Sequence, residues 1–214
     1  MSCSSEKIDP QEFAWALRGM PCIGGAISRD IKQAIIPYLD DLDPIARDIG
    51  SVNTVIRTGK LLKGYNTDAL GFRQAILAGL GPNINKVDTV VCYGYGGVTN
   101  VVVHVLKSLG KAVYITGRRP DVVQQKAEEL EASVWSEDIA ADMFINAAPV
   151  TDRPLENALM FLDAIRGCKF VFDHEMPGRC LVEYCTDNGV SLIRGEEMYK
   201  PQMEAQWSLF LEPY

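Results

Sequence analysis

The chain has 214 residues and a formal net charge of −7, so it can form one large or two small domains with a sizeable core. Its hydrophobic content of 47% is ordinary for a globular protein, and its acidic balance argues against binding to nucleic acid or to an anionic membrane surface. No apolar stretch is long enough to span a bilayer and no apolar signal core stands near the start, so we expect a cytoplasmic protein.

Cysteines and histidines give no sign of a disulfide framework or of a metal site. The six cysteines form no C-x-x-C pair, and neither of the two histidines stands at ligand spacing with a cysteine. This pattern favours reduced thiols, as in a cytosolic protein, and predicts that no metal is bound. An anionic ligand of this acidic chain must therefore be held by local groups.

The first 68 residues carry the signals of a small domain of helices and strands. Asp9 is suited to cap a helix over 9–18 whose first residue is Pro10. The later elements predicted here are a strand over 22–27, two short helices over 31–50 broken near Pro37 and Pro44, and a β-hairpin over 51–68 with Thr58 and Gly59 at its turn.

The rest of the chain alternates between helical and strand-like segments. Helices are predicted over 69–80, 98–110, 121–132, 179–189 and 196–211, and strands over 87–93, 112–116, 132–135, 141–149, 169–174 and 190–195. Such alternation over 87–193 predicts the α/β class, with a doubly wound parallel (Rossmann) sheet. A second, smaller and incomplete α/β domain precedes it, and the boundary is expected near Asp68.

Three glycines follow the strand over 87–93 and open the next helix. Gly94 would let the chain turn sharply, Gly96 would let a pyrophosphate approach the backbone, and the free N–H groups of the helix that Gly97 opens favour an anion. The pattern departs from G-x-G-x-x-G, because no glycine stands at its third spaced position. Taken alone, it also fits a plain glycine turn.

The following strand ends in Gly117, Arg118 and Arg119, with no acidic residue before Asp121. An acidic residue at this position would hold the ribose 2′-hydroxyl of NAD, whereas arginine suits the 2′-phosphate of NADP. The alternative is a pair of solvated surface arginines. The pattern favours NADP as the cofactor.

A second polar cluster consists of Asn53 and the run Gly64-Tyr65-Asn66-Thr67-Asp68. Thr67 or Asp68 could do no more than cap the following helix, and Lys32 could be an ordinary solvated lysine. Next to a dinucleotide-binding unit, however, a lysine and an aspartate could pass a proton to or from an alcohol while the nicotinamide moves a hydride.

Taken together, the motifs resemble shikimate dehydrogenase and its shikimate/quinate dehydrogenase-like relatives over nearly the whole chain. SVNTV and GYNTDALGF look like that family's A-V-N-T and G-x-N-T-D-x-x-G-F motifs. YGYGGVTN, TGRRP and INAAP are similar to its glycine loop, its NADP 2′-phosphate segment and its strand end beside the nicotinamide, and GEEMYKPQMEAQW is similar to its closing helix.

This resemblance implies an NADP-dependent oxidoreductase that reversibly reduces 3-dehydroshikimate to shikimate, on the route to chorismate and the aromatic amino acids. It implies a partial substrate-binding domain over 1–68, an NADP-binding Rossmann domain over 69–194, and a C-terminal helix over 195–214 that returns to the substrate domain. It also implies a small-molecule substrate, with no nucleic-acid or membrane partner.

The resemblance also implies roles for individual residues. Lys32 and Asp68 would form the catalytic pair, with the choice of proton carrier left open. Ser28, Asn53 and Gln202 would bind the hydroxyls of the ring substrate. The implied NADP-binding set is Gly94, Gly96, Gly97, Gly117, Arg118, Arg119 and Ala147.

Several departures from the family pattern keep other functions open. The family's first strand–helix–strand portion, with a Ser-x-Ser pair that grips the substrate carboxylate, has no counterpart here; Asp30 stands near Lys32, and Ala148 replaces a threonine. One alternative is therefore a catalytically impaired nucleotide-binding relative with a regulatory or no enzymatic role. Another is a dehydrogenase for a related polyol acid such as quinate. A shortened domain would leave sheet edges and apolar faces exposed, which predicts a homodimer or a chain of low stability.

Overall fold

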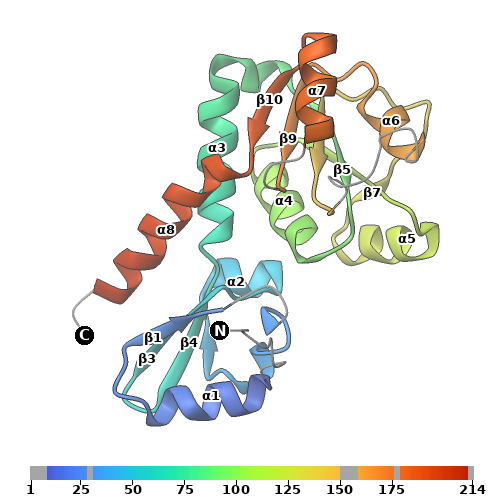
Figure 1. The fold of residues 1–214 in the computed structure, drawn as a ribbon. Helices are drawn as coiled ribbons and strands as arrows, with labels where there is room; N and C mark the ends of the chain where they lie inside the picture. The colour runs from blue at the N-terminus through green and yellow to red at the C-terminus, as the bar shows by residue number, and fades with distance from the viewer. Residues whose placement is uncertain (1–8, 28–30, 150–158, 176–178, 212–214) are drawn as a thin grey trace, which may run out of the picture. The chain divides into compact units, whose positions relative to one another are not determined.

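The computed structural model describes residues 9–27, 31–149, 159–175 and 179–211 (Figure 1). The chain divides into two compact units. The smaller unit consists of Met1–Thr67 together with Met203–Tyr214, and the larger unit is Asp68–Gln202. In the described ranges, no helix combines the length and the apolar character needed to cross a membrane.

The larger unit is built on a sheet of six strands. These are β5 (Thr89–Tyr93), β6 (Ala112–Thr116), β7 (Ser133–Val134), β8 (Met143–Asn146), β9 (Phe170–Asp173) and β10 (Ser191–Arg194). Their order is β10-β9-β8-β5-β6-β7, and every neighbouring pair is parallel. The order reverses between β5 and β8, which is the doubly wound arrangement. The predicted fold class is confirmed.

Helices flank this sheet (Figure 1). They are α3 (Asp68–Leu80), the 3₁₀ helix η3 (Gly81–Lys86), α4 (Gly97–Ser108), α5 (Pro120–Glu129), α6 (Leu159–Ile165), α7 (Arg179–Asn188) and the start of α8 (Glu196–Leu211). The unit alternates strand and helix because right-handed crossovers between parallel strands require an intervening element on a sheet face. The short helix α6 was not predicted from the sequence.

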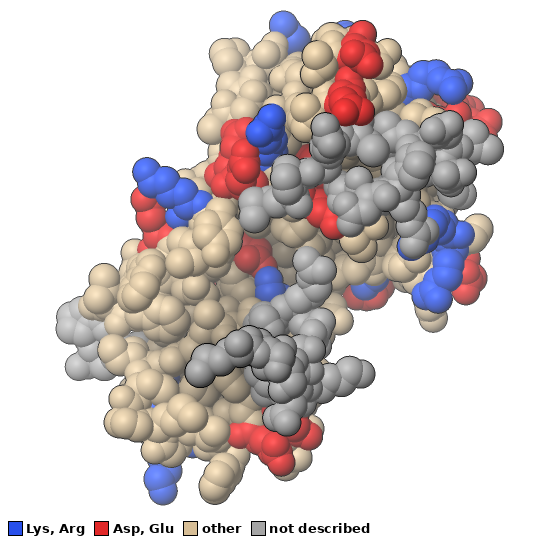
Figure 2. Space-filling view, viewed as in Figure 1, with Lys and Arg blue, Asp and Glu red and all other residues tan. Residues whose placement is uncertain are grey.

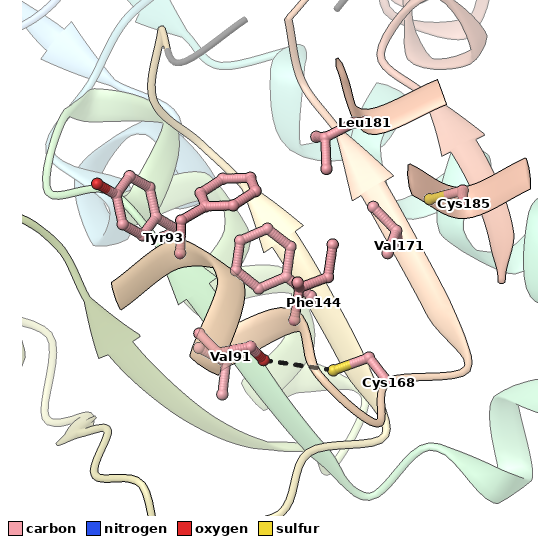
Figure 3. Close-up of a cluster of buried hydrophobic side chains, with 10 residues drawn as sticks. Val91, Tyr93, Phe144, Cys168, Val171, Leu181 and Cys185 are labelled. Carbon is pink, nitrogen blue, oxygen red and sulfur yellow. Dashed lines mark hydrogen bonds between the residues drawn. The ribbon is translucent and has the colours of Figure 1, made fainter. Parts of the chain in front are cut away.

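One core of the larger unit lies between α6, α7 and the middle strands (Figure 3). Phe161 of α6 stacks edge-on against Tyr93 of β5 and Phe144 of β8, with ring centroids 5.0 and 4.7 Å away. The thiol of Cys168 points into the same cluster and donates to the Ala164 carbonyl at 3.5 Å. Burial raises its pKa to about 12, so this thiol is an apolar packing group and not a nucleophile.

The smaller unit contains a four-stranded mixed sheet. Its elements are α1 (Pro10–Gly19), β1 (Gly24–Ala26), η2 (Ile36–Tyr38), β2 (Asp41–Leu42), α2 (Pro44–Ile49), β3 (Thr54–Thr58) and β4 (Leu61–Tyr65). The strand order is β1-β3-β4-β2, with β3 antiparallel to both β1 and β4, and β2 parallel to β4. The Asp9 carboxylate caps α1 by accepting from the Gln11 and Glu12 N–H groups, as the sequence predicts.

The two short helices expected over 31–50 are only partly correct. The first is replaced by turns and by η2, because Pro37 has no N–H to donate to a carbonyl one α-helical turn earlier. Tyr38 and Leu39 instead donate to Ile35 and Ile36, three residues back, at 3.0 and 3.1 Å. The second is α2, which Pro44 begins at its first helical position.

Candidate functional site

Gly94 has a backbone conformation that requires glycine. Its φ of 135° lies in a region that side-chain-bearing residues rarely adopt, and a Cβ there would come within 3.0 Å of the Ala147 carbonyl. Its N–H donates to the Thr116 carbonyl at 2.9 Å. The loop leaving β5 is therefore held against the ends of both β6 and β8.

The next two glycines of the loop are exposed. Gly96 is the N-cap of α4, and a Cβ built on either Gly96 or Gly97 would meet no atom of the described residues within 4 Å. Among the described residues, none therefore covers the two glycines at the amino end of this twelve-residue helix, where its first N–H groups and its dipole favour an anion. This geometry leaves room for a diphosphate to approach the backbone.

The end of β6 presents Gly117 and the two exposed residues Arg118 and Arg119. The ring of Tyr95, from the glycine loop, packs so close to Gly117 that a Cβ there would lie 3.1 Å from ring carbons. The Arg119 guanidinium carbon lies 5.5 Å from the centroid of the same ring. The glycine loop and the arginine pair therefore form one surface.

Ala147 follows β8 directly, and its N–H donates to the Tyr93 carbonyl at 2.9 Å. The seven residues predicted to bind NADP thus gather at the carboxyl ends of β5, β6 and β8, where the strand order reverses. In open α/β sheets this crevice is where ligands bind. Their role in binding a cofactor stays a prediction.

A buried polar pair, missed in the sequence, lies at the neighbouring strand ends. Asn146 and Asp173, the last residues of β8 and β9, are 0 and 4% exposed, and Asn146 Nδ2 donates to Asp173 Oδ1 at 2.9 Å. Asn146 Oδ1 accepts from the Ala148 N–H at 3.2 Å, and Asp173 Oδ1 accepts from the Glu175 N–H at 3.2 Å. The pair thereby ties together the loops that follow β8 and β9.

Burial raises the pKa of the Asp173 carboxyl above its usual value, and the hydrogen bonds from Asn146 and Glu175 oppose that rise. In the sequence, this pair is visible only as a polar residue at the carboxyl end of each of two apolar strands. A spacing of 27 residues gives no indication that the two side chains meet.

Asp68 and Gln202 belong to the larger unit. Asp68 is the first residue of α3, and one turn later a Cβ at Gly71 would come within 2.6 Å of the Met198 carbonyl and 2.7 Å of the Gln202 Cβ. Only a glycine permits so close an approach of α8. The start of α3 and the predicted substrate ligand on α8 are thus neighbours within this unit.

Asn53 belongs to the smaller unit, where it is 3% exposed. Its Oδ1 accepts from the Thr67 N–H and from the Thr54 hydroxyl, both at 2.9 Å, and its Nδ2 donates to Thr67 Oγ1 at 2.9 Å. Gln206 Nε2 donates to Thr54 Oγ1 at 2.8 Å and to the Asn53 carbonyl at 3.3 Å. The amide of Asn53 therefore fastens the two ends of the β3–β4 hairpin.

The remaining predicted residues are Lys32 and Ser28. Lys32 is half-buried in the smaller unit, and its carbonyl accepts from the Val52 N–H at 2.9 Å, which anchors it beside the residue preceding Asn53. Ser28 lies outside the described residues. Within the described ranges, no group of three His, Cys, Asp or Glu side chains could hold a metal ion.

On the face in view, lysines and arginines lie among aspartates and glutamates (Figure 2). The expectation that the chain binds no nucleic acid stays a prediction.

The chain is similar in sequence to bacterial shikimate dehydrogenases named as NADP(+) enzymes. It is 32% identical over 186 residues to the protein of Moorella thermoacetica and 40% identical over 144 residues to that of Desulforamulus reducens. These alignments cover 78 and 64% of this chain but only 62 and 47% of the relatives, so the chain spans less than two thirds of either. No protein-family model matches the chain.

Superposition on solved structures covers a larger share of both chains than the sequence alignments do. Quinate dehydrogenase of Corynebacterium glutamicum, solved in complex with NAD, superposes with a TM-score of 0.80 at 27% identity, over 98% of this chain and 80% of that one. A shikimate 5-dehydrogenase-like protein superposes with a TM-score of 0.79 at 25% identity, over 96% of this chain and 78% of that one.

Proposed function

We propose, from the premise that this chain belongs to the shikimate dehydrogenase-like family, that it is an NADP-dependent oxidoreductase of a shikimate-class ring acid. The reaction would be the reversible reduction of 3-dehydroshikimate to shikimate. The observation that carries the proposal is the open glycine loop at the strand-order reversal, with an arginine pair on the next strand end. Shikimate dehydrogenases with 32 and 40% identity are named as NADP(+) enzymes, which supports the same cofactor.

Each part of the cofactor has proposed contacts. The diphosphate would lie at the amino end of α4, against Gly96 and Gly97, because free N–H groups and the helix dipole stabilise negative charge there. Arg118 and Arg119 would hold the 2′-phosphate, whose charge and geometry suit guanidinium groups. The nicotinamide would lie toward Ala147. Bound there, it supplies hydride transfer to or from the substrate carbon.

Protein side chains would move the proton and hold the substrate. Lys32 of the smaller unit and Asp68 of the larger one are the proposed proton-transfer groups, and a nearby ammonium would also stabilise negative charge developing on the carbonyl oxygen. Gln202, Asn53 and Ser28 are the proposed ligands of the ring hydroxyls.

Quinate with NAD is the second candidate. It is favoured by the superposition on quinate dehydrogenase, which covers nearly all of this chain at 27% identity. Quinate and shikimate present the same class of ring hydroxyls, so the two candidates differ most clearly in their cofactor. The strand-end arginines are the groups expected to discriminate NADP from NAD.

Compartment and assembly form part of the same proposal. Cys22, Cys92, Cys168 and Cys185 are free thiols, which agrees with a cytoplasmic protein. A homodimer is expected because the smaller unit exposes Trp15, Met20 and Ile23. Sedimentation of the purified chain at several concentrations tests this, and a monomer at every concentration would contradict it.

A steady-state assay tests the activity. The purified chain is mixed with NADP and either shikimate or quinate, and NADPH formation is followed by absorbance. The proposal predicts turnover with shikimate, lost in Lys32→Met, a variant of similar length without the charge. Turnover with quinate and NAD alone would favour the second candidate, and the absence of any turnover with intact NADPH binding would favour a catalytically impaired relative.

A further inference from the structure

Tyr95 stands between two glycines of the loop and lies half-buried. Its ring packs on Gly117, where a Cβ would be 3.1 Å from the ring carbons Cδ1 and Cε1 and 3.3 Å from a methyl of Val123. The absence of a side chain at Gly117 is therefore what lets the ring approach the end of β6 so closely. The ring therefore lies at the end of β6, beside Arg119.

The guanidinium of Arg119 lies over this ring, with its central carbon 5.5 Å from the centroid. That distance is within the range in which an arginine is attracted by the negative face of an aromatic ring. Arg119 is also the N-cap residue of α5, with an extended backbone, so its side chain leaves from a fixed point. An exposed arginine would otherwise sample many rotamers, and ordering it costs free energy at the moment of binding.

We propose that Tyr95 positions the Arg119 guanidinium for the 2′-phosphate of the cofactor and so contributes to a preference for NADP over NAD. This inference rests on the proposed function. The attraction between the guanidinium and the ring involves no N–H hydrogen bond, so it leaves the N–H groups, which bind phosphate oxygens, available to the cofactor. Because Tyr95 belongs to the diphosphate loop, the same short segment shapes both anion-binding parts of the surface.

A different role for the ring would be direct stacking on the adenosine portion, which NADP and NAD share. The two roles predict different results. A ring that acts through Arg119 affects only the cofactor with the 2′-phosphate and has no effect once Arg119 is removed. A ring that touches adenosine affects both cofactors equally, whether or not Arg119 is present.

The test is a double-mutant cycle on dissociation constants of the full chain, measured by NADPH and NADH fluorescence. The variants are Tyr95→Leu, Arg119→Ala and the double substitution, with Tyr95→Phe as the matched control that keeps the ring. The exposed stacking predicts that Tyr95→Leu weakens NADPH binding about three- to fivefold and leaves NADH binding within about twofold. Tyr95→Phe should bind NADPH like the wild type, and Tyr95→Leu should add nothing to Arg119→Ala.

The inference is overturned if Tyr95→Leu weakens the binding of both cofactors equally, or if it weakens NADPH binding as much in the Arg119→Ala background as in the wild type. Either result would leave the proposal that the chain binds NADP in place. If the wild type itself does not bind NADPH, the proposed function fails, and this inference with it. A thermal melt of each variant checks folding. Tyr95→Met, which keeps an apolar contact with Gly117 but has no aromatic face, replaces Tyr95→Leu if the latter does not fold.

Discussion

The predicted ligand groups of the two units have opposite environments. At the strand ends of the larger unit, Gly96, Gly97 and Arg118 are exposed, and no described residue lies within 4 Å of a Cβ added at either glycine. In the smaller unit, Asn53 is buried and bonded to Thr67 and Thr54. A ligand can therefore approach the first group directly, whereas the second group already stabilises the fold. In the larger unit, a substitution at a ligand group should change ligand affinity without changing the free energy of unfolding. In the smaller unit, such a substitution should change both.

The largest expected effect is on turnover. Replacing Asp68 by Asn keeps the shape of the side chain but removes its ability to take or hold a proton. Loss of a positioned proton-transfer group typically costs about 10²–10⁴-fold in rate, so kcat should fall by that order. NADPH affinity, measured by fluorescence, should stay unchanged. A kcat within about threefold of the wild type would remove Asp68 from the catalytic pair.

Two glycines of one loop allow stability and binding to be separated. Gly94→Ala forces a Cβ against the Ala147 carbonyl at a φ of 135°, so the free energy of unfolding should drop by at least about 2 kcal/mol. At Gly96 the backbone conformation is ordinary, and an added Cβ would have no neighbour within 4 Å in the part of the chain that the structure describes, so Gly96→Ala should change stability by less than about 0.5 kcal/mol.

Gly96→Ala should nonetheless weaken NADPH binding, because the added methyl group points into the space proposed for the diphosphate. Urea unfolding and NADPH titration of both variants check this pair. Unchanged NADPH affinity in Gly96→Ala would place the diphosphate elsewhere.

In the smaller unit a polar substitution should cost stability. Gln206→Ala removes the hydrogen bonds to Thr54 Oγ1 and the Asn53 carbonyl, both buried, and should lower the free energy of unfolding by about 1–3 kcal/mol. Ser208→Ala is the control on the same helix, since its exposed hydroxyl bonds only the Glu204 carbonyl. Equal effects of the two substitutions in urea unfolding would contradict the account of this network.

The smallest expected effect is a change in pH dependence. Burial raises the pKa of Asp173 in the folded protein above its unfolded value. The carboxyl therefore contributes stability that is fully present below the unfolded value near 3.8 and is lost as pH rises through the folded value. Asp173→Asn, which can still accept from Asn146 and Glu175, should abolish this loss. Thermal melts between about pH 4 and 7 measure it, and an unchanged slope would contradict the assignment.

Most of the larger unit could be predicted because its signals are local. The apolar run over 87–93 and the glycines that follow it specify a strand and a turn without reference to distant residues. The helix α6 could not be predicted, because seven residues are too few to show a helical period. At η2, a proline gives turns where the apolar pattern suggests a helix.

The site shows the same division between local and distant signals. The glycine loop and the arginine pair stand out in the sequence, whereas the Asn146–Asp173 pair and the Tyr95–Arg119 stack depend on which strands become neighbours. Asn53 was identified through a motif, but its burial in a hydrogen-bond network follows only from the pairing of β3 with β4.

We propose that the larger unit binds NADP through its strand-end arginines. Fluorescence titration of the full chain with NADPH and with NADH tests it most directly, without requiring turnover. We expect saturable NADPH binding that is at least about tenfold tighter than NADH binding. The affinity should fall as salt is added, because salt screens the attraction between the 2′-phosphate and exposed arginines. NADH binding as tight as NADPH binding, or tighter, would contradict it.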